Sequence, residues 1–117
     1  MVVDFDDPVR ESIGLGRNFL TQYPALEGVI AASDYLALGL IAAAQERGLR
    51  VPTDLKITGV DDFVLGLQAS VPLTTYHIPY EEVGRRCFAF LQERVQQPDA
   101  PTRLETVRGE IVVRASA

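Results

Sequence analysis

Two aspartates, Asp61 and Asp62, follow directly after the short apolar run Leu55–Val60. Pro52 precedes this run and the acidic pair ends it, which is typical of a β-strand. In an open parallel α/β sheet, ligands bind in the crevice outside the carboxyl ends of the strands. A carboxylate at that place can accept charge-assisted hydrogen bonds from the hydroxyl groups of a polyhydroxylated molecule. The sequence therefore predicts that Asp61 binds a ligand.

A second pair of polar residues ends a neighbouring apolar run, residues 26–32. Ser33 and Asp34 follow that run and precede a helical pattern, so either side chain can accept a backbone N–H at the helix N-terminus. If the two runs are adjacent strands, these residues could also present acceptors to the ligand of Asp61. For Asp34 we favour helix capping.

Residues that could perform catalysis or bind a metal are few. His77 is the single histidine and Cys87 the single cysteine, so a zinc site is not indicated and an internal disulfide is excluded. Cys87 lies within an apolar helical pattern, which predicts a buried thiol. Asp61 and Asp62 are adjacent on a strand end and are expected to point to opposite sides, unlike a glycosidase pair. The sequence favours a binding protein without a cofactor over an enzyme.

Composition narrows the class of protein further. The 117 residues are 47% hydrophobic and 23% charged, the balance of one folded domain. The net charge of −5 offers no basic surface for nucleic acid. No run of 18 apolar residues occurs, so no membrane span is expected. The start of the sequence lacks the features of a signal peptide and resembles a strand entered abruptly.

The elements that must position these residues alternate in type. Apolar periodicity, glycines and prolines predict strands at 1–5, 26–32, 55–60, 73–77 and 104–114, separated by helices at 9–23, 35–47, 63–69 and from 79. Such alternation predicts an α/β fold with a parallel sheet and right-handed crossovers. Gly14 and Gly16 stand inside a helical pattern, so we expect close packing on the sheet there and not a phosphate loop.

The helix at 35–47 carries no charged residue for more than two turns. A helix that is apolar on every side must be covered on every side. The sheet can cover one side, and we expect a second subunit to cover the other, through Leu36, Leu40 and Ala43 or Ala44. Burial within a larger parent domain is the alternative.

Several short motifs resemble the lactose-repressor/galactose-repressor family, in the family's order and with its spacing. They cover the whole chain and are strong only in combination. The matching stretches are Ala32-Ser33-Asp34 with Ala37-Leu38-Gly39, Gly48 to Asp54 (GLRVPTD), Gly59-Val60-Asp61-Asp62, Pro72-Leu73-Thr74-Thr75, Gly84-Arg85 and Val113-Arg114-Ala115-Ser116.

The resemblance implies a cytoplasmic transcription regulator whose effector domain has a periplasmic-binding-protein-like type I fold, with two Rossmann-like α/β lobes around a small molecule. Residues 1–77 would form most of the C-terminal lobe. Residues 78–117 would supply a crossover helix and a final strand to the N-terminal lobe, whose main body is missing, so the domain is truncated here. Operator DNA would be bound only by a helix-turn-helix that is absent from these residues.

The same resemblance implies roles for individual positions. Asp61 corresponds to the family's ligand-contacting aspartate, and Ser33 stands where many members have a ligand-contacting asparagine. Ile30 and Ile78 replace an aromatic and a polar contact, which allows an effector less polar than a typical sugar. The helix at 36–44 and the segment 63–69 fall at the family's homodimer interface, with Phe63, Leu67 and Ala69 as further interface candidates.

Two further expectations follow. The rival function is an exported sugar-binding protein of a transporter or receptor, which shares the fold but normally works as a monomer; the uncharged helix argues against it.

Without its native lobe, the helix from Pro79 should expose an apolar face that includes Phe90 and Leu91. We expect that face to dock on another copy, with exchange of elements between chains.

Overall fold

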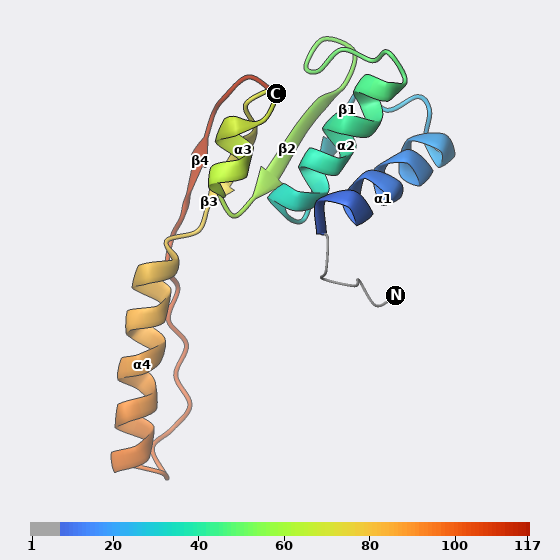
Figure 1. Cartoon of the computed structure of the whole chain (residues 1–117). Coiled ribbons are helices and arrows are strands. Elements are labelled where there is room, and N and C mark those ends of the chain that lie inside the picture. Colours follow the sequence, from blue (N-terminus) through green and yellow to red (C-terminus); the bar gives the residue numbers. More distant parts are fainter. Residues whose placement is uncertain (1–7) are drawn as a thin grey trace.

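The computed structural model describes residues 8–117, so the strand expected at 1–5 lies outside the described residues. The remaining elements have the predicted types and order (Figure 1). They are α1 (Pro8–Gln22), β1 (Gly28–Ile30), α2 (Asp34–Glu46), β2 (Lys56–Val60), α3 (Val64–Gln68), β3 (Thr74–His77), α4 (Tyr80–Gln96) and β4 (Glu110–Val112).

The four strands form one sheet in the order β1-β2-β3-β4. The first three run parallel, with Val29 opposite Ile57 and Thr58 opposite Thr74, which confirms the predicted parallel sheet. The fourth strand is antiparallel and pairs Thr75 with Val112. Its direction follows from the path of the chain, because the segment after α4 runs back alongside that helix before it enters the sheet (Figure 1).

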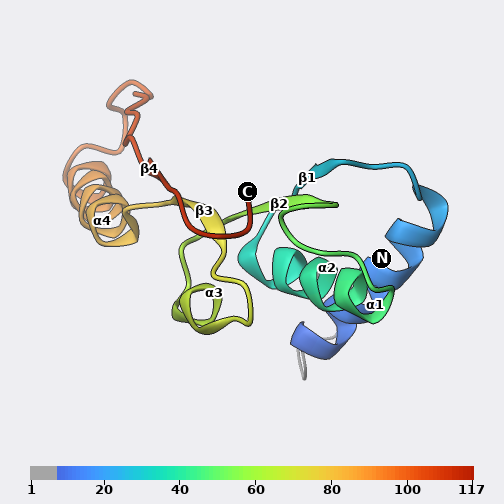
Figure 2. The same ribbon diagram turned by 90° about the horizontal axis from the view of Figure 1, so that it is seen from above.

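Helices cover one face of the sheet. α2 and α3 lie on the same side, and α1 packs against α2 (Figure 2). Along β2 the side chains alternate, with Ile57 and Gly59 buried on the helical face while Thr58 and Val60 are only half-buried. The core therefore sits between the sheet and α2, and it consists of Leu20, Ala31, Ala37, Leu40, Ile41, Ala43, Ala44, Leu55, Ile57 and Leu73.

α1 and α2 cross at a pair of glycines. A Cβ added at Gly39 would lie 2.3 Å from the backbone carbonyl of Ser12, and one at Gly16 would lie 2.8 Å from the carbonyl oxygen of Gly39. The predicted close packing of Gly16 is therefore present, but against a helix and not against the sheet. A Cβ added at Gly14 would meet no atom within 4 Å.

α1 also supplies the cover that we expected from a second subunit. Leu40 is 7% exposed, and Ala43 and Ala44 are fully buried within this chain. These three side chains are therefore not available to a partner in this structure, which corrects their assignment to a dimer interface. Leu36 remains partly exposed.

The motif Gly48 to Asp54 forms the turn between α2 and β2. Gly48 ends α2 with φ +74°, a conformation that glycine adopts without strain. The Asp54 carboxylate accepts hydrogen bonds from the backbone N–H and the guanidinium of Arg50, at 2.7–2.8 Å. These bonds lower the pKa of Asp54 to about 2.

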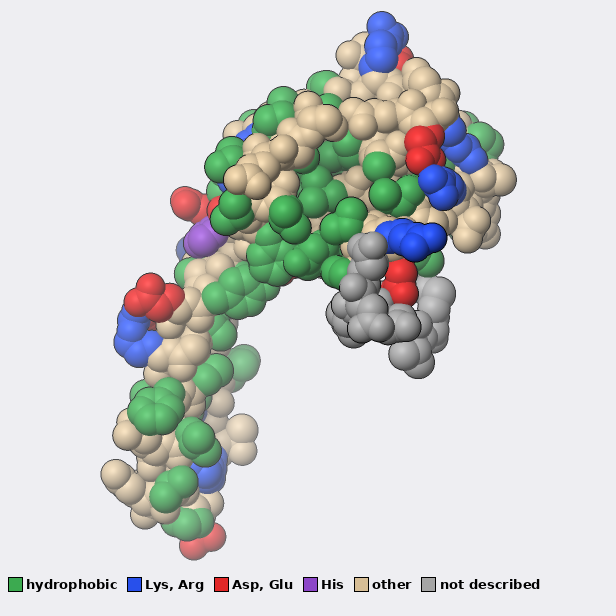
Figure 3. All heavy atoms as spheres, viewed as in Figure 1, with side chains coloured by type: hydrophobic (Ala, Val, Ile, Leu, Met, Phe, Trp, Pro, Cys, Tyr) green, Lys and Arg blue, Asp and Glu red, His purple; other side chains and the backbone are tan. Residues whose placement is uncertain are grey.

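α4 and the segment that follows it project from the body as an arm, residues 78–109 (Figure 1). The radius of gyration is 17.9 Å, whereas a compact chain of this length has about 13 Å. α4 contains no buried residue, and Leu91 and Val95 are 58% and 72% exposed. Hydrophobic side chains are visible along the arm in Figure 3. Cys87 is exposed, contrary to the predicted burial, because the body of the fold does not cover this helix.

The last residues return to the body. The Ser116 hydroxyl donates to the Ile57 carbonyl (2.6 Å) and accepts from the Thr74 backbone N–H (2.8 Å), so it bridges β2 and β3. The Ile57 N–H donates to the Ser116 carbonyl at 2.8 Å. Our expectation that the final strand accompanies α4 to another lobe therefore differs from this structure, where β4 and residues 113–116 lie on the sheet of the body.

Candidate functional site

A pocket of about 490 Å³ opens at the carboxyl ends of β2 and β3, where the arm begins. Three segments form it: the turn between β2 and α3, the end of β3, and the first turns of α4. This is the place that the parallel sheet predicted for a ligand. The lining residues are Asp61, Asp62, Phe63, His77, Ile78, Pro79, Tyr80, Glu81, Glu82 and Arg85.

Asp61 occupies the tip of β2 in an unusual backbone conformation. Its φ is 118°, a value that non-glycine residues rarely adopt. Its backbone N–H donates to the carbonyl of Tyr76 at 3.0 Å, which continues the pairing with β3. Its carboxylate accepts a hydrogen bond from the hydroxyl of Tyr80, at the start of α4. This hydrogen bond is the main cause that raises the pKa of Tyr80.

Asp62 has different partners from Asp61. Its carboxylate forms an ion pair with Arg114 and contacts Nδ1 of His77 at 3.1 Å. The hydrogen bond from Arg114 lowers the pKa of Asp62, and His77 contributes less. The two adjacent carboxylates are thus bound to separate groups, one on the arm and one on the C-terminal segment.

The first turns of α4 bring more charge to the pocket. Glu82 pairs with both Arg86 and Arg85, and the hydrogen bond from Arg86 is the main cause that lowers the pKa of Glu82. Glu81 lies 3.4 Å from Arg85. The two arginines therefore balance the acidic residues of this turn. The carboxylate of Asp61 is the acceptor in the pocket that carries no ion pair.

The structure brings two of the four predicted ligand residues together. Asp61 and Ile78 both line the pocket at the strand ends. Ile30 is 85% exposed and lines a separate apolar pocket of about 300 Å³, together with Leu36. The Ser33 hydroxyl caps α2, because it accepts the backbone N–H of Leu36 at 3.4 Å.

Asp34 does not cap the helix, and its side chain is fully buried. One carboxylate oxygen accepts from the Thr75 hydroxyl (2.6 Å) and the other from the Phe63 backbone N–H (2.8 Å). Capping was therefore the wrong interpretation of Asp34, since the neighbouring serine fills that role. The carboxylate instead links α2 to the turn that carries Asp61 and Asp62.

Sequence reasoning missed Tyr80 and Arg114 as contacts of the two aspartates. Tyr80 follows Pro79 at a helix start, where no local pattern distinguishes it from a surface aromatic. Arg114 belongs to a motif that was noticed, but it lies 52 residues beyond Asp62. The sequence alone could not pair them.

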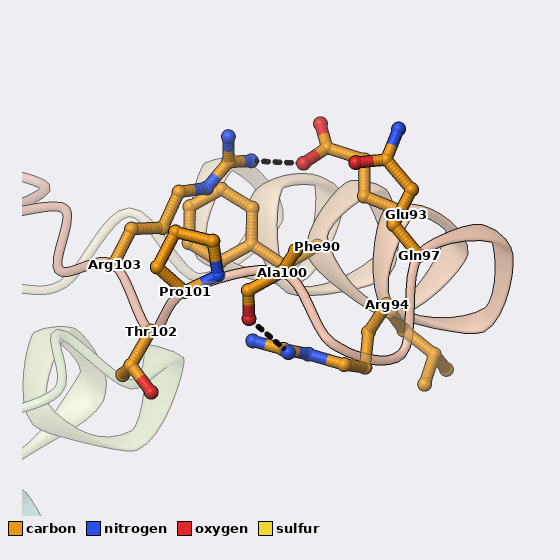
Figure 4. Close-up of a pocket in the computed structure, with 9 residues that line it drawn as sticks. Phe90, Glu93, Arg94, Gln97, Ala100, Pro101, Thr102 and Arg103 are labelled. Atoms are coloured by element: carbon orange, nitrogen blue, oxygen red, sulfur yellow. Dashed lines mark hydrogen bonds and ion pairs between the residues drawn. The ribbon is translucent and has the colours of Figure 1, made fainter.

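A second pocket, of about 510 Å³, lies on the arm between α4 and the returning segment (Figure 4). The guanidinium of Arg103 stacks over the ring of Phe90, 4.0 Å from its centroid, and forms an ion pair with Glu93 at 2.7 Å. The charged side chains of this pocket thus already have partners, since Arg94 donates to the carbonyls of Pro98 and Ala100. It holds no strand end and no unpaired carboxylate, so it is the weaker ligand site.

The segment predicted for dimerisation exposes apolar side chains. Phe63 and Leu67 are 36% and 57% exposed, and their neighbours Val64 and Leu65 are 68% and 45% exposed. The ring of Tyr35 packs against that of Phe63 with centroids 5.3 Å apart, so the surface continues onto α2. Ala69 is partly buried beside it.

Two negative findings apply to residues 8–117. No three His, Cys, Asp or Glu side chains in this part gather in a way that could hold a metal ion. None of the described helices combines the length and the apolar character needed to cross a bilayer.

Comparison with known proteins gives a consistent picture. Residues 6–117 match the model of the family described as the periplasmic binding protein-like domain. The HTH-type transcriptional repressor PurR of Vibrio atlanticus is 39% identical over 88 residues, which cover 75% of this chain and 26% of the relative. PurR of Vibrio campbellii is 40% identical over 86 residues, with 74% and 26% covered. The chain thus spans about a quarter of the length of these curated relatives.

Solved structures agree with the sequence relatives. The structure of the transcriptional regulator CelR in complex with cellobiose has a TM-score of 0.85 and 28% identity, and the match covers 100% of this chain and 38% of that one. A LacI family transcriptional regulator from Arthrobacter sp. FB24, in complex with lactose, has a TM-score of 0.77 and 28% identity, with 92% and 41% covered. Both neighbours hold a disaccharide.

Proposed function

We propose a function from the premise that this chain belongs to the family of periplasmic binding protein-like domains, in the form found in LacI-type regulators. The chain is the effector-binding and dimerisation region of a bacterial transcriptional regulator. Its effector is a sugar or a related small molecule, and the effector controls DNA binding by a helix-turn-helix in another part of the protein. The repressors and regulators among its relatives support this proposal over an exported sugar-binding protein.

The observation that carries the proposal is the position and the hydrogen bonding of the Asp61 carboxylate. Its carboxylate lies at the carboxyl end of β2, in a pocket, and accepts a hydrogen bond from a neutral hydroxyl, that of Tyr80. A sugar offers the same kind of donor, and a carboxylate binds such hydroxyls more strongly than a neutral acceptor does. Asp61 is therefore the principal ligand contact, with Ile78 as an apolar wall beside it. Ile30 and Ser33 remain candidate contacts at the end of β1 and before α2, although neither lines the pocket of Asp61.

The proposal involves no catalysis and no cofactor. The effector acts by binding more tightly to one arrangement of two lobes than to another, and it shifts the equilibrium only by that difference in affinity. Residues 1–77 belong to the C-terminal lobe together with β4 and the residues after it, which lie on the same sheet, and α4 contributes to the N-terminal lobe. The exposed side chains of Leu91 and Val95 on α4 support this division, because such an apolar face is normally covered.

The active protein is a cytoplasmic homodimer. The exposed apolar side chains of α3 and the adjoining Tyr35 support an interface there, since isolated apolar patches of this kind mark protein contacts. Leu36, Phe63, Leu67 and Ala69 remain the interface candidates. Operator DNA is bound by another part of the protein, because the net charge of −5 on this chain repels phosphate groups.

Calorimetric titration of the whole natural protein with lactose, cellobiose, glucose and sucrose tests the proposal. We expect at least one saccharide to bind and Asp61→Ala to weaken its binding about tenfold or more, the cost of one hydrogen bond to a charged group. Asp99→Ala is the matched control, because Asp99 is an exposed aspartate near the tip of the arm. Equal affinities for Asp61→Ala and the unsubstituted protein would disprove the site.

A further inference from the structure

Asp34 is a fully buried carboxylate with no cation beside it among its hydrogen-bond partners. Burial of a charge is costly unless hydrogen bonds compensate it. Here the Thr75 hydroxyl donates to Oδ1 at 2.6 Å, and the Phe63 backbone N–H donates to Oδ2 at 2.8 Å. Asp34 is also the first residue of α2, where the helix dipole favours a negative charge. The carboxylate thus ties α2 to two other segments, β3 and the turn before α3.

The Asp34 carboxylate occupies the space that a side chain at position 59 would need. A Cβ at Gly59 would lie 2.3 Å from Oδ1 of Asp34, a distance that no real side chain tolerates. Gly59 is on β2, only two residues before Asp61. The three motifs that carry Asp34, Gly59 and Thr75 therefore meet at one point, although up to 41 residues separate them in the sequence.

The same hydrogen bonds hold the turn that presents Asp61. Asp61 and Asp62 have φ of 118° and 58°, so the backbone turns sharply where β2 ends. Beyond the turn, the Asp62 N–H donates to the Thr75 hydroxyl at 3.4 Å and the Phe63 N–H donates to Asp34. Both amides that follow Asp61 are thus fixed by the pair Asp34 and Thr75.

We propose that Asp34 is a positioning residue, which sets the conformation of the turn 61–63 and thereby aims the carboxylate of Asp61 into the ligand pocket. Asp34 itself does not line that pocket. Its consequence for ligand affinity rests on the proposed function, whereas its effect on the turn does not. Thr75 is a second positioning residue, because its hydroxyl joins the carboxylate of Asp34 to the Asp62 amide.

Backbone-amide NMR of the 117-residue chain tests the effect on the turn. An N–H resonates downfield when it donates a hydrogen bond. The Phe63 amide should therefore move upfield in Asp34→Asn, which replaces its carboxylate acceptor, and the Asp62 amide should move upfield in Thr75→Val, which removes its hydroxyl acceptor. Thr75→Val keeps the shape of the side chain and is informative even if Asp34→Asn fails to fold. Ser116→Ala is the matched control, because it also removes a buried hydroxyl with two hydrogen bonds, but at Ile57 and Thr74.

Titration of the whole protein with the saccharide that it binds gives the second readout. We expect Thr75→Val to weaken binding about fivefold or more and Ser116→Ala to leave it within about twofold, because only the former disturbs the turn. An unmoved Phe63 amide in a folded Asp34→Asn variant, an unmoved Asp62 amide in Thr75→Val, or equal movements in Ser116→Ala would overturn the proposal. Unchanged affinity despite a moved amide would overturn its link to the ligand. If the unsubstituted protein binds none of the saccharides, the proposed function fails, and the amide shifts still decide the role of Asp34.

Discussion

The carboxylate of Asp34 lies directly over Gly59, with room for a hydrogen atom at that position and for nothing larger. The two residues belong to different motifs, one at the start of α2 and one within β2. The buried charge requires glycine at position 59, and Thr75 on β3 supplies the charge with a donor. The structure thus explains why these short motifs occur together.

The contact between Asp34 and Gly59 predicts the effect of a single methyl group. Gly59→Ala should destabilise the fold by about 1–3 kcal/mol, the usual cost of overpacking a core, because the carboxylate cannot move without losing its donors. Gly28→Ala is the matched control, since the nearest atom to a Cβ at this strand glycine is 3.8 Å away. Urea unfolding monitored by circular dichroism measures both, and equal stabilities of the two variants would contradict the role of this contact.

The crossing of α1 and α2 predicts that alanine has opposite effects on stability at two glycines. Gly39→Ala should destabilise by about 1–3 kcal/mol, because its Cβ would meet the backbone of Ser12 and push the helices apart. Gly14→Ala, on the open side of α1, should raise stability by up to about 1 kcal/mol through helix propensity. Thermal unfolding of both variants checks this. A loss of stability in Gly14→Ala as large as in Gly39→Ala would argue against a specific crossing.

The ion pair of Asp62 with Arg114 predicts how stability depends on pH. The pKa of Asp62 is lower in the folded chain, so this pair stabilises the fold above the ordinary aspartate pKa of about 3.9 and is lost as the pH falls below it. Arg114→Gln should lower stability at pH 7 by about 1–3 kcal/mol and flatten the loss of stability below pH 4, because Asp62 then titrates near its usual value.

Urea unfolding between pH 2 and pH 7 measures that profile. Arg108→Gln is the control, since Arg108 is exposed and the substitution removes the same charge. If the profiles of the two variants coincide, the ion pair contributes nothing to acid stability.

The exposed arm predicts self-association of the 117-residue chain. Leu91 and Val95 lie on the apolar face of α4, which has no cover, and burying them on a second copy is favourable. We expect sedimentation velocity to show dimers or larger species whose population rises with concentration. Leu91→Glu should weaken the association, and Ala89→Glu should not, because residue 89 lies on the opposite side of the helix. A monomer at every concentration would refute this prediction.

Much of the fold could be predicted because its signals are local. Gly48 ends α2, Pro79 precedes α4, and the apolar runs before Ser33 and Asp61 are strands, as expected from periodicity and helix boundaries. The site was only partly predictable. Asp61 was identified because parallel strands end at one edge, and Ile78 lines the same pocket, whereas Ile30 faces another pocket and Ser33 caps a helix.

The errors share one physical cause, which is that a contact depends on distant parts of the chain. Asp34 is of a residue type that is common at helix N-caps. Only the fold brings Thr75 and the Phe63 amide to it. Ala43 was expected at a subunit interface, because the sequence does not reveal that α1 crosses α2 there. Cys87 was expected to be buried, because an apolar pattern indicates that a face should be covered and not what covers it.

By itself the sequence determined the order of the elements, the parallel α/β class, the strand end that carries Asp61 and the resemblance to a regulator family. These follow from side-chain period, backbone propensity and short motifs, which act over a few residues. Tertiary structure alone decided which motifs meet, that the Asp34 carboxylate fixes the turn, that Arg114 pairs with Asp62, and that α4 stands free. Each of these depends on the packing of segments that lie far apart in the chain, which local sequence patterns do not encode.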